Sequence, residues 1–481
     1  MVKTFIRLVI IWTAGLWPAL WTSGFQPASR SGLQYLAMKT ETGKTLARSL
    51  RTTEFFTLAF GTMVGVGWLI VIDDWLTRGG PLGAMLGFLL GGIFLLPVAY
   101  VYAKFVRAIP NAGAEIAYVT TVFPRSVAFT SGWLMTLAYL IVCPWEAVAI
   151  GKLVGYLIPG IKSMQIYSVG GRPVFLPALI LGLLTTMLII FLNYRGIRLT
   201  AKFQNYTTFA LLLSFAGFTL LGSTRIEWEN YQPLFSTAGN IVSIILVLQI
   251  VPYFLTGFES VPKCVEEAAP NQDPRGLSKA IFLALGVGVL FYVLIIFVVS
   301  GLVPWKSIAS ESYGTAIAFE RAFGSDTIVR FILIAALFSL LKVFNGNFIA
   351  ASRLIFALGR GDWIASTFGA VHQRFSTPHV AVIFCGVITV LGALMGDSIL
   401  IPITEVGSTC SLLGWFMTCV AYLKWKKEIT GKEKIIAVTG ATVAALLLLL
   451  KVIPQMPGSL GRWEYLALAV WLAIGLVLRK K

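Results

Sequence analysis

The stretch Gly61-Thr62-Met63-Val64-Gly65-Val66-Gly67-Trp68 lies inside an apolar run that covers residues 53–76. Each glycine costs a helix about 1 kcal/mol relative to alanine, so a helix that faces lipid gains nothing from three of them. Irregular backbone is tolerated inside a membrane only where it lines a cavity or is buried in protein. The glycines therefore predict a helix that is broken near mid-membrane, with free N–H and C=O groups facing a small polar solute. The alternative is a close helix-packing surface, which small residues also favour.

The composition of the chain is that of a membrane protein. Of its 481 residues, 57% are hydrophobic and 12% are charged, and the mean hydropathy is +0.83. These values exclude an ordinary soluble domain, and apolar runs long enough to cross a bilayer recur along the chain. We therefore predict an all-α integral membrane protein with twelve transmembrane helices. Their expected bounds are 53–76, 81–106, 127–158, 174–193, 203–222, 239–262, 278–303, 327–356, 379–396, 399–423, 434–453 and 463–478.

The net charge of +17 indicates membrane topology rather than a nucleic-acid partner. With the N-terminus inside, most Lys and Arg residues fall in cytoplasmic segments such as 353–374 and 424–434, and few fall in the opposite loops. This distribution follows the positive-inside rule. It predicts an inner or plasma membrane protein with both termini in the cytoplasm.

Cysteine and histidine usage indicates neither a disulfide framework nor a metal site. The five cysteines lie in or beside apolar spans without C-x-x-C spacing. The two histidines, His372 and His379, share one loop, which argues against a histidine metal centre. We expect no cofactor.

Residues 1–37 do not fit the charge topology, because an extra span there would invert it. We interpret this segment as a non-native extension before a start at Met38. A cleaved signal peptide and an interfacial segment are the alternatives. The transporter-like domain is then 38–481, with a core at about 53–425 and two further helices at about 434–478.

A second interruption occurs in the predicted span 239–262. Its sequence Gln249-Ile250-Val251-Pro252-Tyr253-Phe254-Leu255-Thr256-Gly257-Phe258-Glu259 places a proline, a glycine and a carboxylate inside an apolar run. Pro252 removes a backbone hydrogen bond, and Gly257 offers a flexible position. The first and sixth helices are thus interrupted at corresponding points of two five-helix halves. This pattern predicts an inverted-repeat transporter with its site at the repeat interface, whereas Gly83, Gly87 and Gly91 on the second helix predict a packing face.

At these residues the sequence resembles the amino acid–polyamine–organocation (APC) superfamily. The resemblance covers roughly residues 44–425 and is carried by motifs in the order seen in that superfamily. They are the glycine stretch 61–67, the Pro-Asn-Ala-Gly segment 110–113 with Glu115, the GFE…EE…NPR-like run 257–281, and the Asn-Gly-Asn and Ser-Arg-Leu-Ile-Phe-Ala segments within 345–357, followed by Thr377-Pro378.

The resemblance implies an amino acid permease that holds a small amino acid or amine between the broken helices. It implies that the backbone N–H groups of Val64, Gly65, Val66 and Gly67 bind a substrate carboxylate. An aromatic gate is implied at Tyr253 and an unwound turn at Gly257. The remaining pocket residues implied by position are Thr256, Phe258 and Asn347.

Two departures from the superfamily bear on ion coupling. Many relatives carry a lysine in the middle of the fifth helix, and this chain has Leu211 there. Those relatives also place two hydroxyl residues four apart on the eighth helix, where this chain has Ser339 and Val343. Sodium coupling at that position and the usual lysine switch are therefore both in question.

Ionisable residues inside membrane spans are costly and mark functional sites by default. Those expected to carry coupling or charge are Glu146, Glu259, Lys342 and Glu405. For Glu146 a structural pair with Lys152 or Lys342 is an open alternative. We expect Lys342 to stand in for the missing fifth-helix lysine, and Asp73 and Asp74 to line a solvated vestibule.

Together these features predict a secondary transporter that moves an amino acid or related amine by alternating access, by proton-coupled symport or by exchange. A polyamine or organic-cation transporter or antiporter of the same fold is the alternative. A membrane-embedded enzyme and a channel are more remote, because no catalytic cluster converges in the spans and paired broken helices suit carriers. No P-loop for ATP occurs. The partners expected are the lipid bilayer, the small-molecule substrate and protons. The substrate, the coupling ion and a homodimeric state stay open.

Overall fold

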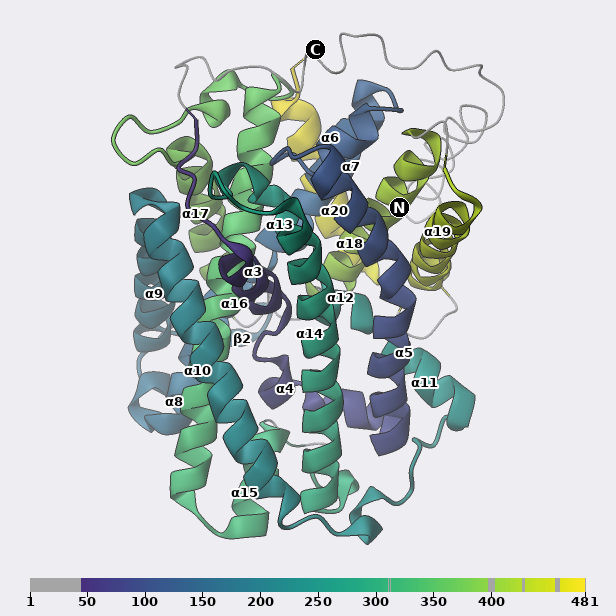
Figure 1. Cartoon of the computed structure of the whole chain (residues 1–481). Coiled ribbons are helices and arrows are strands. Elements are labelled where there is room, and N and C mark those ends of the chain that lie inside the picture. The colour runs from purple at the N-terminus through teal and green to yellow at the C-terminus, as the bar shows by residue number, and fades with distance from the viewer. Residues whose placement is uncertain are drawn as a thin grey trace.

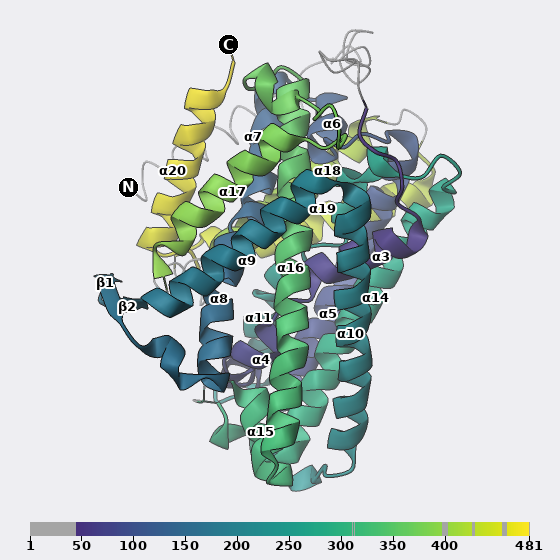
Figure 2. The same cartoon turned by 90° about the vertical axis from the view of Figure 1, so that its left-hand side faces the viewer.

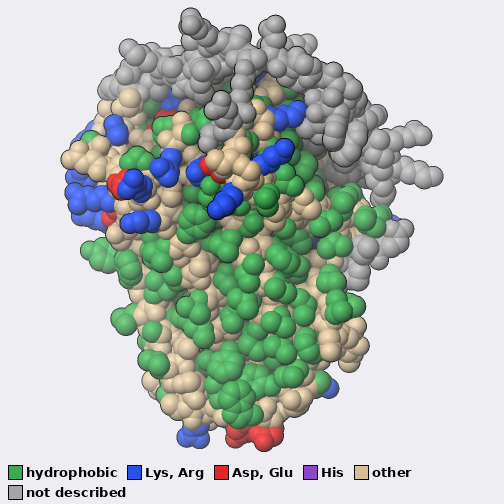
Figure 3. All heavy atoms as spheres, turned by 45° about the vertical axis from the view of Figure 1, so that its right-hand side comes forward, with side chains coloured by type: hydrophobic (Ala, Val, Ile, Leu, Met, Phe, Trp, Pro, Cys, Tyr) green, Lys and Arg blue, Asp and Glu red, His purple; other side chains and the backbone are tan. Residues whose placement is uncertain are grey.

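The computed structural model describes residues 45–480 apart from 310, 312, 397–402, 426–428 and 455–458. The interpretation of residues 1–37 therefore lies outside the described residues. The described chain forms one elongated helical bundle with one short β-hairpin (Figure 1). On the face shown in Figure 3, apolar side chains cover the middle of the bundle, whereas Lys and Arg gather towards one end. Such a belt suits a bilayer, so the chain is an integral membrane protein.

The first half of the bundle contains one interrupted span, Thr52–Ile70, and the hairpin. Its helices and strands are α3 (Thr52–Met63), α4 (Gly67–Ile70), α5 (Ile72–Ala108), α6 (Glu115–Thr120), α7 (Arg125–Leu140), α8 (Val142–Leu157), β1 (Gln165–Val169), β2 (Arg172–Phe175), α9 (Leu176–Arg195) and α10 (Ile197–Ser223). The two strands pair antiparallel and lie at the side of the bundle, next to the start of α9 (Figure 2).

The second half contains the other interrupted span and four long helices. Its helices are α11 (Asn240–Leu248), α12 (Val251–Leu255), α13 (Ser260–Lys263), α14 (Pro274–Leu302), α15 (Gly314–Phe323), α16 (Asp326–Arg360), α17 (His379–Ala393), α18 (Ile403–Trp425), α19 (Gly431–Val452) and α20 (Arg462–Leu478).

Nine helical stretches within the described ranges are long and apolar enough to cross a membrane. They are Thr52–Ile70, Ile72–Ala108, Arg125–Leu157, Leu176–Arg195, Ile197–Ser223, Pro274–Leu302, Asp326–Arg360, Glu405–Trp425 and Gly431–Val452. The other three predicted spans correspond to the divided α11–α12–α13, to α17 and to α20, which are each shorter. The all-α membrane class is thus confirmed, whereas the twelve-span topology and the inverted repeat stay predictions.

The predicted break in the first span is present. Helix α3 ends at Met63 because Val64 leaves the helical region, with φ −90° and ψ 96°, and α4 starts only at Gly67. Both pieces lie in the middle of the bundle, where α3 packs against α10, α14 and α16 (Figure 1). The unwound backbone is therefore surrounded by protein, as a membrane requires.

The predicted break in the sixth span is also present. Helix α12 ends at Leu255, and Thr256 is extended with ψ 128°. Gly257 has φ +142°, a conformation that side chains rarely adopt. Helix α13 begins at Ser260. Each of the two broken spans thus loses its regular helix near the centre of the bundle.

The glycine row on α5 is a packing face, as predicted. A Cβ on Gly87 would lie 2.6 Å from the Val247 side chain of α11, and one on Gly91 would lie 2.4 Å from Val251 of α12. Only a residue without a side chain allows this approach.

The end of the bundle that carries α6 is held by buried charges, here called the paired-charge cluster: Glu115, Lys263, Glu267 and Arg353. Lys263 Nζ lies 2.6 Å from Glu115 Oε1, joining α13 to α6. Arg353 of α16 donates to both carboxylate oxygens of Glu267, at 3.1 and 2.8 Å. All four side chains are fully buried. The cluster therefore ties the segment that follows the second break to α6 and α16.

Candidate functional site

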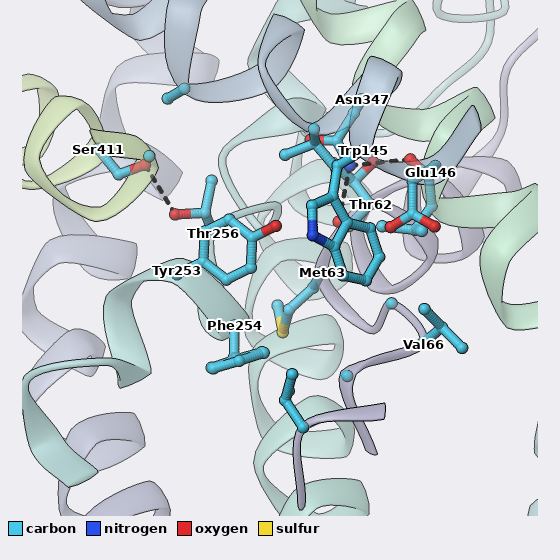
Figure 4. Close-up of a pocket in the computed structure, with 17 residues that line it drawn as sticks. Thr62, Met63, Val66, Trp145, Glu146, Tyr253, Phe254, Thr256, Asn347 and Ser411 are labelled. Atoms are coloured by element: carbon cyan, nitrogen blue, oxygen red, sulfur yellow. Dashed lines mark hydrogen bonds between the residues drawn. The ribbon is translucent and has the colours of Figure 1, made fainter. Parts of the chain in front are cut away.

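A cavity of about 80 Å³ lies where the two broken helices meet α8, α16 and α18 (Figure 4). It lies at the middle of the bundle rather than at its surface. Six of the nine residues predicted to bind substrate line it, together with the predicted charge Glu146. The six are Gly65, Val66, Gly67, Tyr253, Thr256 and Asn347.

The other three predicted binding residues do not line the cavity. Val64 is fully buried behind the break. Gly257 lies against α3, since a Cβ there would be 2.6 Å from the Met63 backbone nitrogen. The Phe258 ring packs at 5.6 Å from the Trp415 ring and at 6.0 Å from the Tyr102 ring. Gly257 and Phe258 therefore support the wall of the site from behind.

The break between α3 and α4 has hydrogen-bonded carbonyls but free N–H groups. Ser339 Oγ donates to the Gly65 carbonyl at 2.8 Å, and Asn347 Nδ2 donates to the Thr62 carbonyl at 3.2 Å. The backbone N–H groups of Val66 and Gly67 have no backbone acceptor among the described residues, whereas the Gly65 N–H interacts with the Tyr292 hydroxyl. Buried N–H groups are rarely left unpaired, so this side of the cavity is suited to a ligand with hydrogen-bond acceptors.

The break after α12 presents the opposite polarity. Thr256 Oγ1 bonds to the Pro252 carbonyl at 2.6 Å and to Ser411 Oγ of α18 at 2.8 Å (Figure 4). The Gly257 N–H, which would continue the helix, bonds to Glu259 Oε2 at 3.0 Å instead. In the part of the chain that the structure describes, no donor reaches the carbonyls of Tyr253 and Phe254, which line the cavity. They offer acceptors to a cationic or N–H-bearing ligand.

Lys342 lies behind the first break. This fully buried α16 side chain donates to the carbonyl of Val64 and, at 3.4 Å, to that of Gly61. Its Nζ also stands 5.2 Å from the centre of the Phe60 ring. It therefore supplies a positive charge to the carbonyl ends that the interrupted α3 leaves open, but it does not line the cavity.

Amide side chains join Lys342 to its surroundings. Gln204 Nε2 of α10 donates to the Lys342 carbonyl at 3.1 Å, and Asn345 Nδ2 donates to Gln204 Oε1 at 2.7 Å. Asn193 Nδ2 of α9 continues the chain of hydrogen bonds to Asn345 Oδ1 at 3.1 Å. Leu211, where the superfamily resemblance leads us to expect a lysine in many relatives, is fully buried.

Glu146 of α8 is 2% exposed and lines the cavity. A Cβ on Gly65 would lie 3.6 Å from its Oε1 atom. Its Oε2 atom has no hydrogen-bond partner among the described residues. Lys342 forms no direct ion pair with Glu146 in the described part of the chain, but the two buried groups lie close enough to interact electrostatically. The alternative of a structural pair with Lys342 therefore stays open.

A site between two interrupted membrane helices matches a family of known proteins. Residues 50–478 match the amino acid permease family. The chain belongs to this family. The predicted APC membership is thereby confirmed, and the chain is a transporter rather than an enzyme.

The permease is distantly similar to transporters with different substrates. The methylthioribose transporter of Bacillus subtilis (strain 168) is 23% identical, over 90% of this chain and 92% of its own. The branched-chain amino acid permease BcaP of the same organism is 24% identical, over 93% and 96%. Cationic amino acid transporter 7, chloroplastic, of Arabidopsis thaliana is 24% identical, over 76% and 64%.

The remaining predicted charges of the permease lie away from the cavity. Glu259 is fully buried at the start of α13, where its carbonyl accepts from Lys263 Nζ at 2.8 Å. Glu405 of α18 forms an ion pair with Lys451 of α19. Asp74 pairs with Arg78 at 2.8 Å on α5. These groups contact protein partners rather than the cavity.

Sequence reasoning missed several residues that line the cavity of the permease. They are Thr62, Met63, Val71, Ala138, Val142, Trp145, Phe254, Val343, Gly407 and Ser411. Thr62, Met63 and Phe254 belong to the two quoted stretches, and Trp145 precedes Glu146, so proximity could have found them. For Ser411 no local signal exists, because its position becomes special only when α18 meets α12.

Proposed function

We propose that the permease moves an amino acid or related small amine through this cavity by alternating access. The observation that carries the proposal is the opposite polarity of the two breaks. Among the described residues, N–H groups without a backbone acceptor lie at Val66 and Gly67, and carbonyls without donors lie at Tyr253 and Phe254, all of which line the cavity. A zwitterion has acceptors and donors that match the two sides.

The proposal includes the topology that such a carrier needs. Twelve helices with two inverted five-helix halves would place the breaks at the repeat interface, near mid-membrane. The α6 end would face the cytoplasm, with both chain termini, in an inner or plasma membrane. Opening towards that side would require the paired-charge cluster to separate or to move as a unit.

We also propose that protons rather than sodium drive the permease. Lys342 donates to two carbonyls of the broken helix, where a bound cation would otherwise lie. A lysine that gains and loses its proton would switch this positive charge on and off and so favour one conformation at a time. Glu146 is the carboxyl group we assign to the same exchange.

Radiolabelled uptake into proteoliposomes tests the transport proposal. The wild-type protein should show saturable uptake and trans-stimulation by an amino acid or amine. Gly65→Val should abolish uptake, because its side chain would extend towards Val343 and Glu146 inside the cavity. Gly286→Val is the matched control, since a Cβ there meets open space on α14. Equal uptake by both variants would return Gly65 to a packing role.

The coupling proposal has its own test. Uptake by the wild-type protein should rise as external pH falls and should not change when sodium replaces potassium or choline. Uptake that needs sodium, with no response to a pH gradient, would refute proton coupling but leave the transport proposal intact.

A further inference from the structure

Gln204 of α10 uses its amide group to join α10 to two other helices. Its Nε2 atom donates to the Thr57 carbonyl of α3 at 3.3 Å and to the Lys342 carbonyl of α16 at 3.1 Å. Its Oε1 atom accepts from Asn345 Nδ2 of α16 at 2.7 Å. The side chain is only 1% exposed. An amide nitrogen has two hydrogens to donate, and both are used here.

The orientation of this amide is fixed by hydrogen bonds that run in one direction. Asn193 of α9 donates to Asn345 Oδ1 at 3.1 Å, and Asn345 donates onward to Gln204. Two carbonyl oxygens lie beyond Gln204, and only its NH2 side can donate to them. A carboxylate or an apolar side chain of similar size would leave both carbonyls without this donor. The position therefore requires an amide.

The first glycine of the broken stretch makes room for this amide. Gly61 is not among the described residues that line the cavity, unlike Gly65 and Gly67. A Cβ on Gly61 would lie 1.9 Å from Gln204 Nε2, and this contact would displace the amide. The close approach of α3 to Gln204 thus explains a glycine that the cavity does not.

Lys342 and Gln204 bind carbonyls on successive turns of α3. The Lys342 ammonium donates to the carbonyls of Gly61 and Val64, and Gln204 donates to that of Thr57, one turn earlier. The lysine holds its carbonyls more strongly when it is protonated, because a charged donor forms the stronger hydrogen bond. The amide does not titrate. The packed position of α3 therefore depends on one contact that responds to protons and one that does not.

We propose that Gln204 is a positioning residue that holds α3 against α16 and thereby sets the pH at which Lys342 releases α3. This inference rests on the proposed function, because it assigns the regulation of the proposed proton switch. Removing the amide weakens the packed position, so a larger protonated fraction of Lys342 is needed to maintain it. The pH of half-maximal uptake should then fall.

The charged surroundings of Lys342 stay constant in such a variant. Among the described residues, Glu146 of α8 is the charged side chain that interacts electrostatically with Lys342. The groups that α3 and α10 place beside Lys342 are neutral, namely backbone carbonyls, the Phe60 ring and the Gln204 amide. A change in the pH profile of a Gln204 variant therefore reports the lost amide.

Uptake into proteoliposomes over a series of pH values tests the inference. Gln204→Met keeps an unbranched side chain but removes both donors. Two lost hydrogen bonds weaken the packed position about tenfold, so the pH of half-maximal uptake should fall by up to about one unit. Asn230→Leu is the matched control, because it removes a buried amide that donates to the Gly301 carbonyl of α14 at 2.8 Å. It should keep the wild-type pH profile.

A second variant keeps the amide but moves it. Gly61→Ala should displace Gln204 Nε2 from α3 and lower the pH of half-maximal uptake in the same direction. Alanine is the better helix residue, so a glycine with no role beyond the helix would predict no loss. Gly61→Ala also tests the inference if Gln204→Met does not fold, which size-exclusion chromatography in detergent would show.

Two results would overturn the inference. One is a wild-type pH profile in both variants, and the other is an equal shift in Asn230→Leu. If wild-type uptake does not respond to pH, the proposed proton coupling fails. Hydrogen–deuterium exchange of the α3 amides then decides the role of Gln204 separately. Exchange should be faster in Gln204→Met than in the wild-type protein and in Asn230→Leu, and equal exchange in all three would refute that role.

Discussion

The paired-charge cluster and the pair of residues at the cavity, Glu146 and Lys342, are equally buried but differently satisfied. In the cluster, Lys263 contacts Glu115 at 2.6 Å, and Arg353 donates two hydrogen bonds to Glu267. At the cavity, Lys342 bonds to backbone carbonyls. Glu146 has no direct ion pair in the described structure and only a longer-range electrostatic interaction with Lys342. One oxygen of Glu115 in the cluster also lacks a hydrogen-bond partner among the described residues, as one oxygen of Glu146 does. A charge with a charged partner on a neighbouring helix fixes the position of that helix. A buried charge without a charged partner on a neighbouring helix is available to bind a ligand or to exchange a proton.

The acidic motif after the second break holds the α6 end together rather than forming part of the cavity. The acidic pair Glu266 and Glu267 follows the second break. Glu266 binds the backbone N–H of Ala112 at 2.9 Å and forms an ion pair with Arg360. Glu267 binds Arg353 of the same helix α16. Motifs that lie far apart in sequence thus meet at the α6 end, away from the cavity.

The largest effect should come from breaking the cluster. Lys263→Met leaves Glu115 as a buried charge without its cation, which costs about 3–5 kcal/mol. We expect a large loss of folded protein, measured by thermal unfolding and by size-exclusion chromatography in detergent. Combining it with Glu115→Leu should recover part of the loss.

An exposed ion pair provides the control for that variant. Arg321→Gln breaks the contact with Glu311, in which both side chains are 41% exposed, and should cost about 0–1 kcal/mol. If Lys263→Met unfolds no more easily than Arg321→Gln, the cluster does not stabilise the fold and the comparison fails.

Lys342→Met should have an intermediate effect on stability and a large one on transport. It leaves the Gly61 carbonyl without its side-chain donor and the Val64 carbonyl with Ser339 alone, at a cost of about 1–3 kcal/mol. Uptake should fall, and what remains should no longer respond to pH. Lys342→Arg, which stays charged, should allow only slow exchange. The exposed Lys279→Met is the matched control. A pH response that persists in Lys342→Met would separate this lysine from coupling.

The smallest effect should come from removing a hydrogen bond between two neutral side chains at the cavity wall. Ser411→Ala removes the 2.8 Å hydrogen bond to Thr256, worth about 1 kcal/mol, and should raise the KM for uptake about fivefold. Thr256→Val should do the same, and the double variant should be no worse than either single one, because both lose one bond. Additive losses would mean that each hydroxyl binds substrate directly.

Local sequence determined where the helices break, which glycines form a packing face, and the class and family of this protein. Glycine and proline positions predicted where the first and sixth spans break, because these residues act on backbone that is already confined to a membrane. The same reasoning separated the packing glycines Gly87 and Gly91 from the cavity residues Gly65 and Gly67. Composition determined the class, and ordered motifs determined the family.

Only the tertiary structure decided which of the predicted residues line the cavity. Phe258 and Gly65 belong to equally suggestive stretches, yet Phe258 packs between Trp415 and Tyr102 whereas Gly65 faces the cavity. Glu259, Glu405 and Glu146 are all carboxylates in apolar spans, and their partners depend on which helices lie beside them. Hydrophobic periodicity specifies that a helix is buried but not which neighbour each side chain meets, because that depends on how all the helices pack. The sequence thus determines where the helices break and which charged residues lie in the spans. Packing determines which of these charged residues faces the cavity.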